Sequence, residues 1–286
     1  MTTEPFLILA GYSAAIIAAS LLGGWLPALV KMTHTRTQLV MSFVAGLMLG
    51  VAVYHLLPHA LLELSGIEGT VEQAGHGSGG GFSAVDTAVW WVMLGMVLML
   101  LLLRLFHFHQ HDFSDEEDGH HQHHGHADHG QGHSHDTTAH PLSWVGIALG
   151  LGLHTLIDGV ALGAAIKTGI LHSEGMALAG FGVFLAIFLH KPLDALSITS
   201  VMQAGGWSAR ARSLANLGFA TLCPLGAVLF FWGVGQSGQE ALIVGSALAF
   251  SAGVFLCIAL GDLLPEVHFH SHDRFKLTFS FLLGIG

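Results

Sequence analysis

Residues 152–163 read GLHTLIDGVALG and place His154 four residues before Asp158 in an otherwise apolar run. A second segment, FLHKPLDA at 188–195, repeats this spacing. On a helix, residues four apart share one face about one turn from each other, so each pair has the spacing of two ligands for one ion. Ionisable residues inside an apolar helix are costly, and they are expected to face a partner or a path for water.

The composition of the chain identifies an integral membrane protein. Its 286 residues are 52% hydrophobic and only 10% charged, with a mean hydropathy of +0.64. We predict an all-α fold, a bundle of eight membrane-spanning helices. The eighth apolar window begins at Phe275 and holds only about a dozen residues, so the last span is expected to be short or truncated. The other seven windows lie near residues 6–30, 40–62, 85–106, 142–166, 176–202, 212–235 and 240–264.

Lysine and arginine are unevenly distributed between the loops, and the excess is expected on the cytoplasmic side. With the N-terminus outside, the outer loops hold only Lys167, and Lys191 lies within a span. We therefore predict that both termini lie outside. The N-terminus lacks the positive flank of a secretory signal, so the first apolar run is expected to be retained. The predicted inner loops carry Lys31, Arg36, Arg104, Arg210, Arg212, Arg274 and Lys276.

The segment 107–140 is a long polar loop, which this orientation puts in the cytoplasm. It carries twelve of the 22 histidines, interleaved with glycine and acidic residues. Such a composition cannot bury a core, so we predict a disordered loop that binds Zn²⁺-like ions loosely. The predicted division of the chain is helices one to three at 1–106, this loop at 107–140, and helices four to eight with the metal site at 141–286.

Charge and cysteine content exclude other classes of protein. The net charge is −10, and seven of the 19 acidic residues fall in the polar segment, so a basic nucleic-acid surface is excluded. Cys223 and Cys257 both lie in apolar runs, which leaves no disulfide framework.

The two His-x-x-x-Asp pairs are predicted to form one metal site. Each pair falls about halfway along its span, and the fourth and fifth spans run antiparallel, so both pairs reach the middle of the bilayer. His154, Asp158 and Asp194 would supply one neutral nitrogen and two carboxylates, with His190 as the candidate fourth ligand. Pro192 removes a backbone donor and is expected to kink the fifth span.

Two further clusters are interpreted as ligands along the path of the metal. His55, His59 and Glu63 follow one another at four-residue steps near the predicted outer end of the second span. Asp262 and Glu266 do the same at the predicted inner end of the seventh. A Leu-Leu-Pro tripeptide accompanies each cluster, which suggests duplicated halves. The alternative is that these are interfacial residues in contact with water.

With these residues the chain resembles the ZIP (Zrt/Irt-like) family of metal transporters over essentially its full length. The family pattern His-Asn-x-x-Glu/Asp-Gly on the fourth helix matches residues 154–159, and the fifth-helix pattern matches 190–194 loosely. The seventh-helix element Ala-Gly-x-Phe-Leu-x-x-Ala-Leu-x-Asp-x-Leu-Pro is kept at 252–265. The resemblance implies eight spans, both termini outside, a His-rich cytoplasmic loop, and metal ligands on the fourth and fifth helices.

Three positions depart from those family members that have a two-metal centre. Those members hold the second ion with an asparagine, an acid on the fifth helix and a glutamate on the sixth, where this chain has Thr155, Lys191 and Cys223. The ligands of the other ion are retained. The resemblance therefore implies a one-metal centre in which the Lys191 ammonium stands where the second cation would be.

The first functional hypothesis is a carrier that takes a divalent transition metal into the cytoplasm by alternating exposure of the mid-membrane site. Zn²⁺ is the expected substrate, although Fe²⁺, Mn²⁺ and Cd²⁺ also suit a His/Asp site. The expected partners are the metal ion and the lipid bilayer, with a homodimer left open, in a bacterial inner membrane. The alternatives are a cation-diffusion exporter, a metal-buffering membrane protein, and an intramembrane zinc hydrolase, which would need an acid and an oxyanion donor besides its metal. We expect no enzyme activity.

Overall fold

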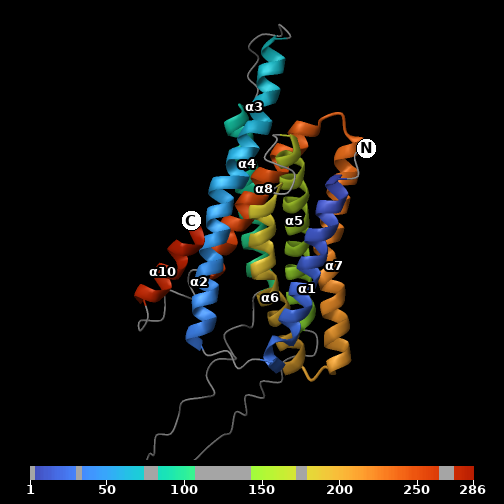
Figure 1. The fold of residues 1–286 in the computed structure, drawn as a ribbon, viewed down its shortest axis with the longest axis vertical. Coiled ribbons are helices and arrows are strands. Elements are labelled where there is room, and N and C mark those ends of the chain that lie inside the picture. Colours follow the sequence, from blue (N-terminus) through green and yellow to red (C-terminus); the bar gives the residue numbers. More distant parts are fainter. Residues whose placement is uncertain (1–3, 30–33, 74–82, 107–142, 172–178, 264–273) are drawn as a thin grey trace, which may run out of the picture.

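The structure, a computed structural model, describes the chain except residues 1–3, 30–33, 74–82, 107–142, 172–178 and 264–273. Every regular element in the described part is a helix (Figure 1). Seven helical stretches there are long and apolar enough to cross a membrane. The elements are α1 Glu4–Leu29, α2 His34–Val51, η1 Ala52–Leu56, α3 Leu57–Gln73, α4 Ala84–Phe106, α5 Ser143–Leu171, α6 Phe181–Ala204, α7 Ala209–Gln236, α8 Glu240–Ile258, η4 Ala259–Leu263 and α10 Arg274–Ile285.

The predicted all-α membrane bundle with a short last span is confirmed. The eighth predicted span corresponds to α10, which has only 12 residues. At the helical rise these span about 18 Å, less than a hydrocarbon core of about 30 Å. The second predicted window is longer than expected, because α2, η1 and α3 form one continuous helical stretch from residue 34 to residue 73. Hydropathy does not detect the polar extension of a helix beyond the apolar core. The His-rich segment lies outside the described residues.

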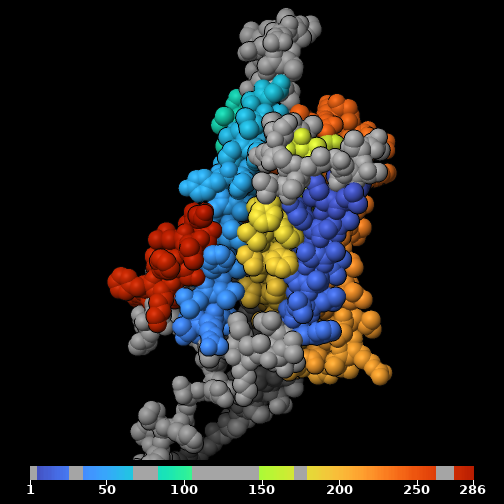
Figure 2. All heavy atoms as spheres, viewed as in Figure 1, coloured from blue at the N-terminus to red at the C-terminus, as the bar shows by residue number. Residues whose placement is uncertain are grey.

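The helices form two groups according to their packing. The first helix group comprises α1, α5, α6 and α7, in which α5 packs mainly on α7 and α1 mainly on α6. The second helix group comprises α2, η1, α3, α4, α8, η4 and α10, in which α4 packs on α8 and α10 on α2. Figures 1 and 2 show α10 and α2 at one side of the molecule and α1 and α7 at the other. Packing between the groups is carried mainly by α5 against α8.

Glycines let α5 and α7 approach to backbone contact. A Cβ atom at Gly159 of α5 would lie 2.0 Å from the carbonyl oxygen of Cys223, and one at Gly226 of α7 would lie 2.2 Å from that of Leu156. Such distances are shorter than any real carbon–oxygen contact, so only glycine fits at either position. Small residues at membrane helix interfaces serve this close approach. The contact fixes the rotation of α5 about its axis, and with it the direction in which its polar residues face.

A structural repeat relates α2–η1 to α8–η4. Each contains a π-helical turn, Ala52–Leu56 in one and Ala259–Leu263 in the other, at the same position relative to its Leu-Leu-Pro tripeptide. Gly46 and Gly253 also occupy equivalent positions, and a Cβ at either would lie 2.0 Å from a carbonyl oxygen, on α10 and on α4 respectively. The duplication suggested by the tripeptides therefore extends to the helix partners.

Candidate metal centre

The two polar pairs meet between α5 and α6. One ligand atom from each of His154, Asp158, His190 and Asp194 can be chosen so that all four atoms lie within 4.8 Å of one another. The first three residues are buried, and the Asp194 side chain is 15% exposed. Among the described residues, this is the cluster of histidine and acidic side chains that suits a metal ion. The predicted convergence occurs, while its role in metal binding stays a prediction.

The distances between the ligand atoms fit a small tetrahedral ion. The Nε2 atom of His154 lies 3.5 Å from Asp158 Oδ2 and 3.9 Å from Asp194 Oδ2. The Nε2 atom of His190 lies 3.2 Å and 3.8 Å from the same two oxygens. Zinc bonds of about 2.0–2.1 Å in tetrahedral geometry separate the ligand atoms by about 3.4 Å. The four histidine–carboxylate distances are thus within about 0.6 Å of the tetrahedral value, and the whole set of four ligand atoms lies within 4.8 Å.

The His190 ring is oriented by its own helix. Its Nδ1 atom lies 2.8 Å from the carbonyl oxygen of Ala186, one turn earlier in α6. A carbonyl only accepts hydrogen bonds, so Nδ1 carries a proton; in the neutral ring the Nε2 lone pair then faces the Asp158 carboxylate, and in the imidazolium form Nε2 donates to it. The 3.2 Å between Nε2 and Asp158 Oδ2 requires a proton or a metal ion between the two atoms, because two lone pairs at this distance repel each other. The backbone hydrogen bond is the usual second support of a metal-bound histidine.

Lys191 supplies the positive charge beside the two carboxylates. Its Nζ atom donates to Asp158 Oδ2 at 2.9 Å, to Asp194 Oδ2 at 3.2 Å and to Thr155 Oγ1 at 2.8 Å. These contacts use all three ammonium protons. The Lys191 side chain is fully buried, and Nζ lies 5.1 Å from the centroid of the Phe219 ring, within the range of a cation–π contact. The ammonium is therefore held in place by four groups.

The other two replaced positions also lie beside the centre. Thr155 is fully buried, and its hydroxyl donates to the carbonyl oxygen of Leu151 at 2.7 Å, which leaves the oxygen free to accept from Lys191. Cys223 is a buried free cysteine on α7, and its carbonyl oxygen faces Gly159. Pro192 lies inside α6, which continues through it from Phe181 to Ala204.

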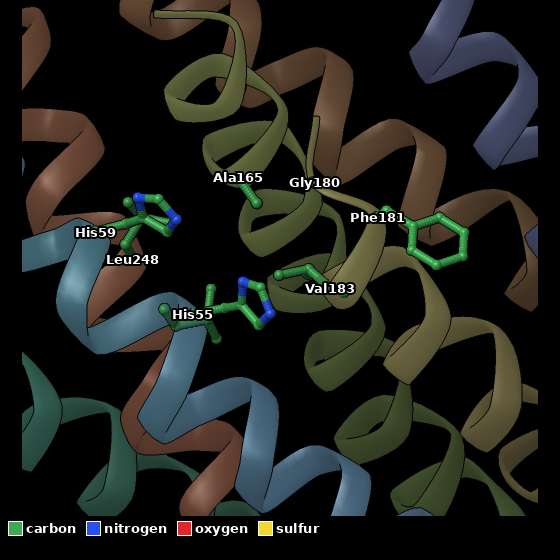
Figure 3. Close-up of a pocket in the computed structure, with 9 residues that line it drawn as sticks. His55, His59, Ala165, Gly180, Phe181, Val183 and Leu248 are labelled. Atoms are coloured by element: carbon green, nitrogen blue, oxygen red, sulfur yellow. The ribbon is translucent and has the colours of Figure 1, made fainter. Parts of the chain in front are cut away.

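Two residues of the first predicted path cluster, His55 and His59, line a small cavity between the two helix groups. His55, in η1, and His59, in α3, face a space of about 40 Å³ that Ala165 and residues 180–183 close from the first helix group (Figure 3). Their ring centroids are 6.4 Å apart. A space of this size holds one or two waters or a partly hydrated ion. In both α5 and α6, the cavity lies seven residues from the centre, which is about 10.5 Å along a helix.

The remaining path residues have different surroundings. Glu63 does not line this cavity: it is 7% exposed, and its Oε1 atom accepts a hydrogen bond from Thr168 of α5 at 3.2 Å. Asp262 falls in η4, and nothing of its side chain is described, while Glu266 lies outside the described residues. The roles of all these residues stay predictions.

Sequence reasoning missed three contacts of the polar residues. The Ala186 carbonyl could have been found, because residues four apart in a helix are neighbours. The positions of Phe219 below Lys191 and of Thr168 beside Glu63 depend on how α7 and α5 are rotated against their neighbours. No local pattern in the sequence encodes those rotations.

A polytopic helical membrane protein with a buried His/Asp/Lys centre is the class that the fold and the site define. Comparison with known families is more specific: the profile of the ZIP zinc transporter family matches residues 6–286. The chain belongs to this family. The resemblance found in the motifs is thus confirmed, and ZIP proteins are transporters and not enzymes.

Several curated zinc transporters are similar to part of the chain. Zinc transporter ZIP9 of Micropogonias undulatus is 38% identical over 130 residues, covering 44% of this chain and 40% of the relative. Zinc transporter ZIP9-B of Xenopus laevis is 38% identical over 133 residues, covering 44% and 42%. Zinc transporter foi of Drosophila melanogaster is 34% identical over 135 residues, covering 47% and 17%. The matches thus span less than half of each relative. All three sources are eukaryotic and give no support to the expected bacterial inner membrane.

Proposed function

We propose that this chain carries divalent transition metal, with Zn²⁺ as the preferred substrate, across the membrane into the cytoplasm through a one-metal site formed by His154, Asp158, His190 and Asp194. The observation that carries the proposal is the meeting of two imidazoles and two carboxylates within 4.8 Å in the buried middle of a membrane bundle. Borderline divalent ions prefer this mixture of ligands. Fe²⁺, Mn²⁺ and Cd²⁺ are further candidate substrates.

The route of the metal follows the boundary between the two helix groups. His55 and His59 would receive the ion from the outer side, and Glu63 and the predicted inner residues Asp262 and Glu266 would complete the path. Buried Leu162 and Ile187 occupy the turns between the small cavity and the centre, which supports a closed path on the side proposed to be outer. Asp194 is the most exposed of the four ligands, which favours access from the side on which α6 ends.

The proposed direction of transport rests on the uneven distribution of lysine and arginine between the two ends of the bundle. Among the described residues, and except for Lys167, the basic residues of the loops and helix ends lie toward the end of the bundle at which α6 ends and α7 begins, and that side is expected to be cytoplasmic. Alternating access then requires one helix group to shift against the other, because all four ligands belong to the first group while the small cavity is shared.

In this proposal the positive charge of Lys191 replaces that of a second metal ion. Two carboxylates without a cation would repel each other in a buried site. The ammonium, 2.9 and 3.2 Å from them, compensates for this repulsion at every stage, and one divalent ion would share the two carboxylates with it.

Uptake by purified protein in liposomes tests the function. The parent chain is expected to accumulate Zn²⁺ inside vesicles and to bind about one ion per chain, and His154→Ala is expected to lose both properties. His34→Ala, at the first residue of α2, serves as the histidine control and should match the parent. Zinc bound to the parent without any flux would argue against a carrier.

Replacement of Lys191 tests the one-metal centre. Lys191→Ala is expected to bind a single Zn²⁺ about tenfold more tightly, because the competing positive charge is gone. Lys191→Asp restores an acid and is expected to bind two ions per chain. Isothermal titration and metal content per chain give both quantities. Parent-like stoichiometry and affinity in both variants would contradict the role given to the ammonium.

A further inference from the structure

A second cavity lies within the first helix group, where α6 ends and α7 begins. It has a volume of about 440 Å³ and is lined by residues of α1, α6 and α7, among them Trp25, Gln203, Arg212 and Asn216. It is therefore much larger than the cavity beside His55. Since α8 and the other helices of the second group contribute no lining residue, it is separate from the boundary along which the metal would travel.

Arg212 brings an uncompensated positive charge into this cavity. Its Nη1 atom donates to Gln203 Oε1, and its Nε atom is buried and has no hydrogen-bond partner among the described residues. Within that part of the chain no carboxylate forms an ion pair with it. By contrast, Lys167 at the opposite end of the bundle pairs with Glu240 at 2.8 Å. A divalent cation would be repelled from such a cavity, whereas an anion would be attracted.

The start of α7 adds to the positive potential. Ser208 caps this 28-residue helix by accepting a hydrogen bond from the backbone of Ala211, and the cavity is lined by side chains of the first two turns. The N-terminal end of a helix carries a partial positive charge that favours phosphate and other oxyanions. Guanidinium donors bind the same oxyanions by paired hydrogen bonds.

Apolar side chains in and near the wall of the cavity are exposed on the surface of the bundle. On α1, Leu22 is 55% and Trp25 56% exposed, and on α7 Leu214 is 69% exposed. In a membrane such side chains contact acyl chains, and tryptophan prefers the level of the headgroups. A basic pocket between membrane-spanning helices on the cytoplasmic side suits an anionic headgroup. We infer that the cavity at Arg212 binds the phosphate of an anionic phospholipid, a site distinct from the metal centre.

Native mass spectrometry of the full chain in neutral detergent tests this inference. The probes are phosphatidylglycerol, phosphatidylcholine of the same chain length, and inorganic phosphate. The parent is expected to retain one phosphatidylglycerol in preference to phosphatidylcholine. Arg212→Gln should weaken retention about fivefold or more, and Arg212→Lys should restore part of it, because one basic residue near the membrane surface contributes about a fivefold effect.

Arg210→Gln is the matched control, because Arg210 is exposed at the same helix end and does not line the cavity. It should retain the lipid like the parent. Equal losses in the Arg210 and Arg212 variants would overturn the site and indicate general surface charge. Inorganic phosphate that displaces the lipid at equal concentration would overturn the lipid assignment. Thermal unfolding in detergent without lipid checks that each variant is folded, and none of these readouts depends on metal transport.

Discussion

Asp158→Asn is expected to abolish both zinc binding at the centre and zinc uptake. Asp158 is fully buried, and its Oδ2 atom lies within 3.5 Å of His154, His190 and Lys191. Asparagine keeps the shape of the side chain but removes the charge and puts an amide beside the other ligands. Loss of this ligand should lower zinc affinity at least about 100-fold. Titration calorimetry and uptake into liposomes measure the two effects.

Asp86→Asn is the control for this variant. Asp86 lies in the first turn of α4, where it and Ser83 form a reciprocal cap with a 2.8 Å hydrogen bond between their side chains. Its replacement should cost about 1 kcal/mol of stability and leave uptake unchanged. Stoichiometric zinc in Asp158→Asn would remove Asp158 from the metal site.

Gly226→Ala and Gly159→Ala are each expected to destabilise the bundle by about 3 kcal/mol. The new methyl groups would meet backbone carbonyl oxygens at 2.2 and 2.0 Å, and backbone cannot yield as a flexible side chain can. The helices α5 and α7 must then separate. Because α5 carries two of the four proposed ligands, uptake should fall with stability. Thermal unfolding in detergent and zinc uptake follow the two losses.

Gly218→Ala, on the same helix as Gly226, tests whether the effect comes from the contact. A Cβ at Gly218 would meet nothing within 4 Å. Alanine is about 1 kcal/mol better than glycine inside a helix, so this variant should be as stable as the parent or more so. If Gly226→Ala unfolded at the same temperature as Gly218→Ala, close packing of α5 on α7 would not limit stability.

Much of the fold could be predicted from the sequence, because a membrane restricts a chain to few solutions. Apolar length alone predicts the spans, and the four-residue spacing of His154 and Asp158 puts both on one face. Antiparallel neighbours at equal depth then bring Asp194 toward them. The membrane constrains the depth of each residue in the bilayer and the periodicity of each helix, and both can be predicted from the local sequence.

The rotation of each helix about its own axis, and the side-chain contacts that depend on it, could not be predicted in the same way. The fourfold anchoring of Lys191 depends on Thr155 and Phe219, which reach it only because α5 and α7 are turned toward α6. The same limit applies to the hydrogen bond from Thr168 of α5 to Glu63 of α3. These contacts arise from packing between helices distant in sequence, and each is a property of the assembled bundle.

The covalent tether of the Lys191 ammonium gives it an effective concentration that no dilution can change. A dissolved cation that competes for the same carboxylates becomes more effective as its concentration rises. The tethered ammonium is present at the same effective concentration at low and at high salt. In the proposed one-metal site, an arriving ion would therefore have to bind strongly enough to share Asp158 and Asp194 with the fixed ammonium. In the proposed site, monovalent ions, with a single charge and weak preference for imidazole, would fail this condition, and the lysine would then exclude the monovalent cations of ordinary salt.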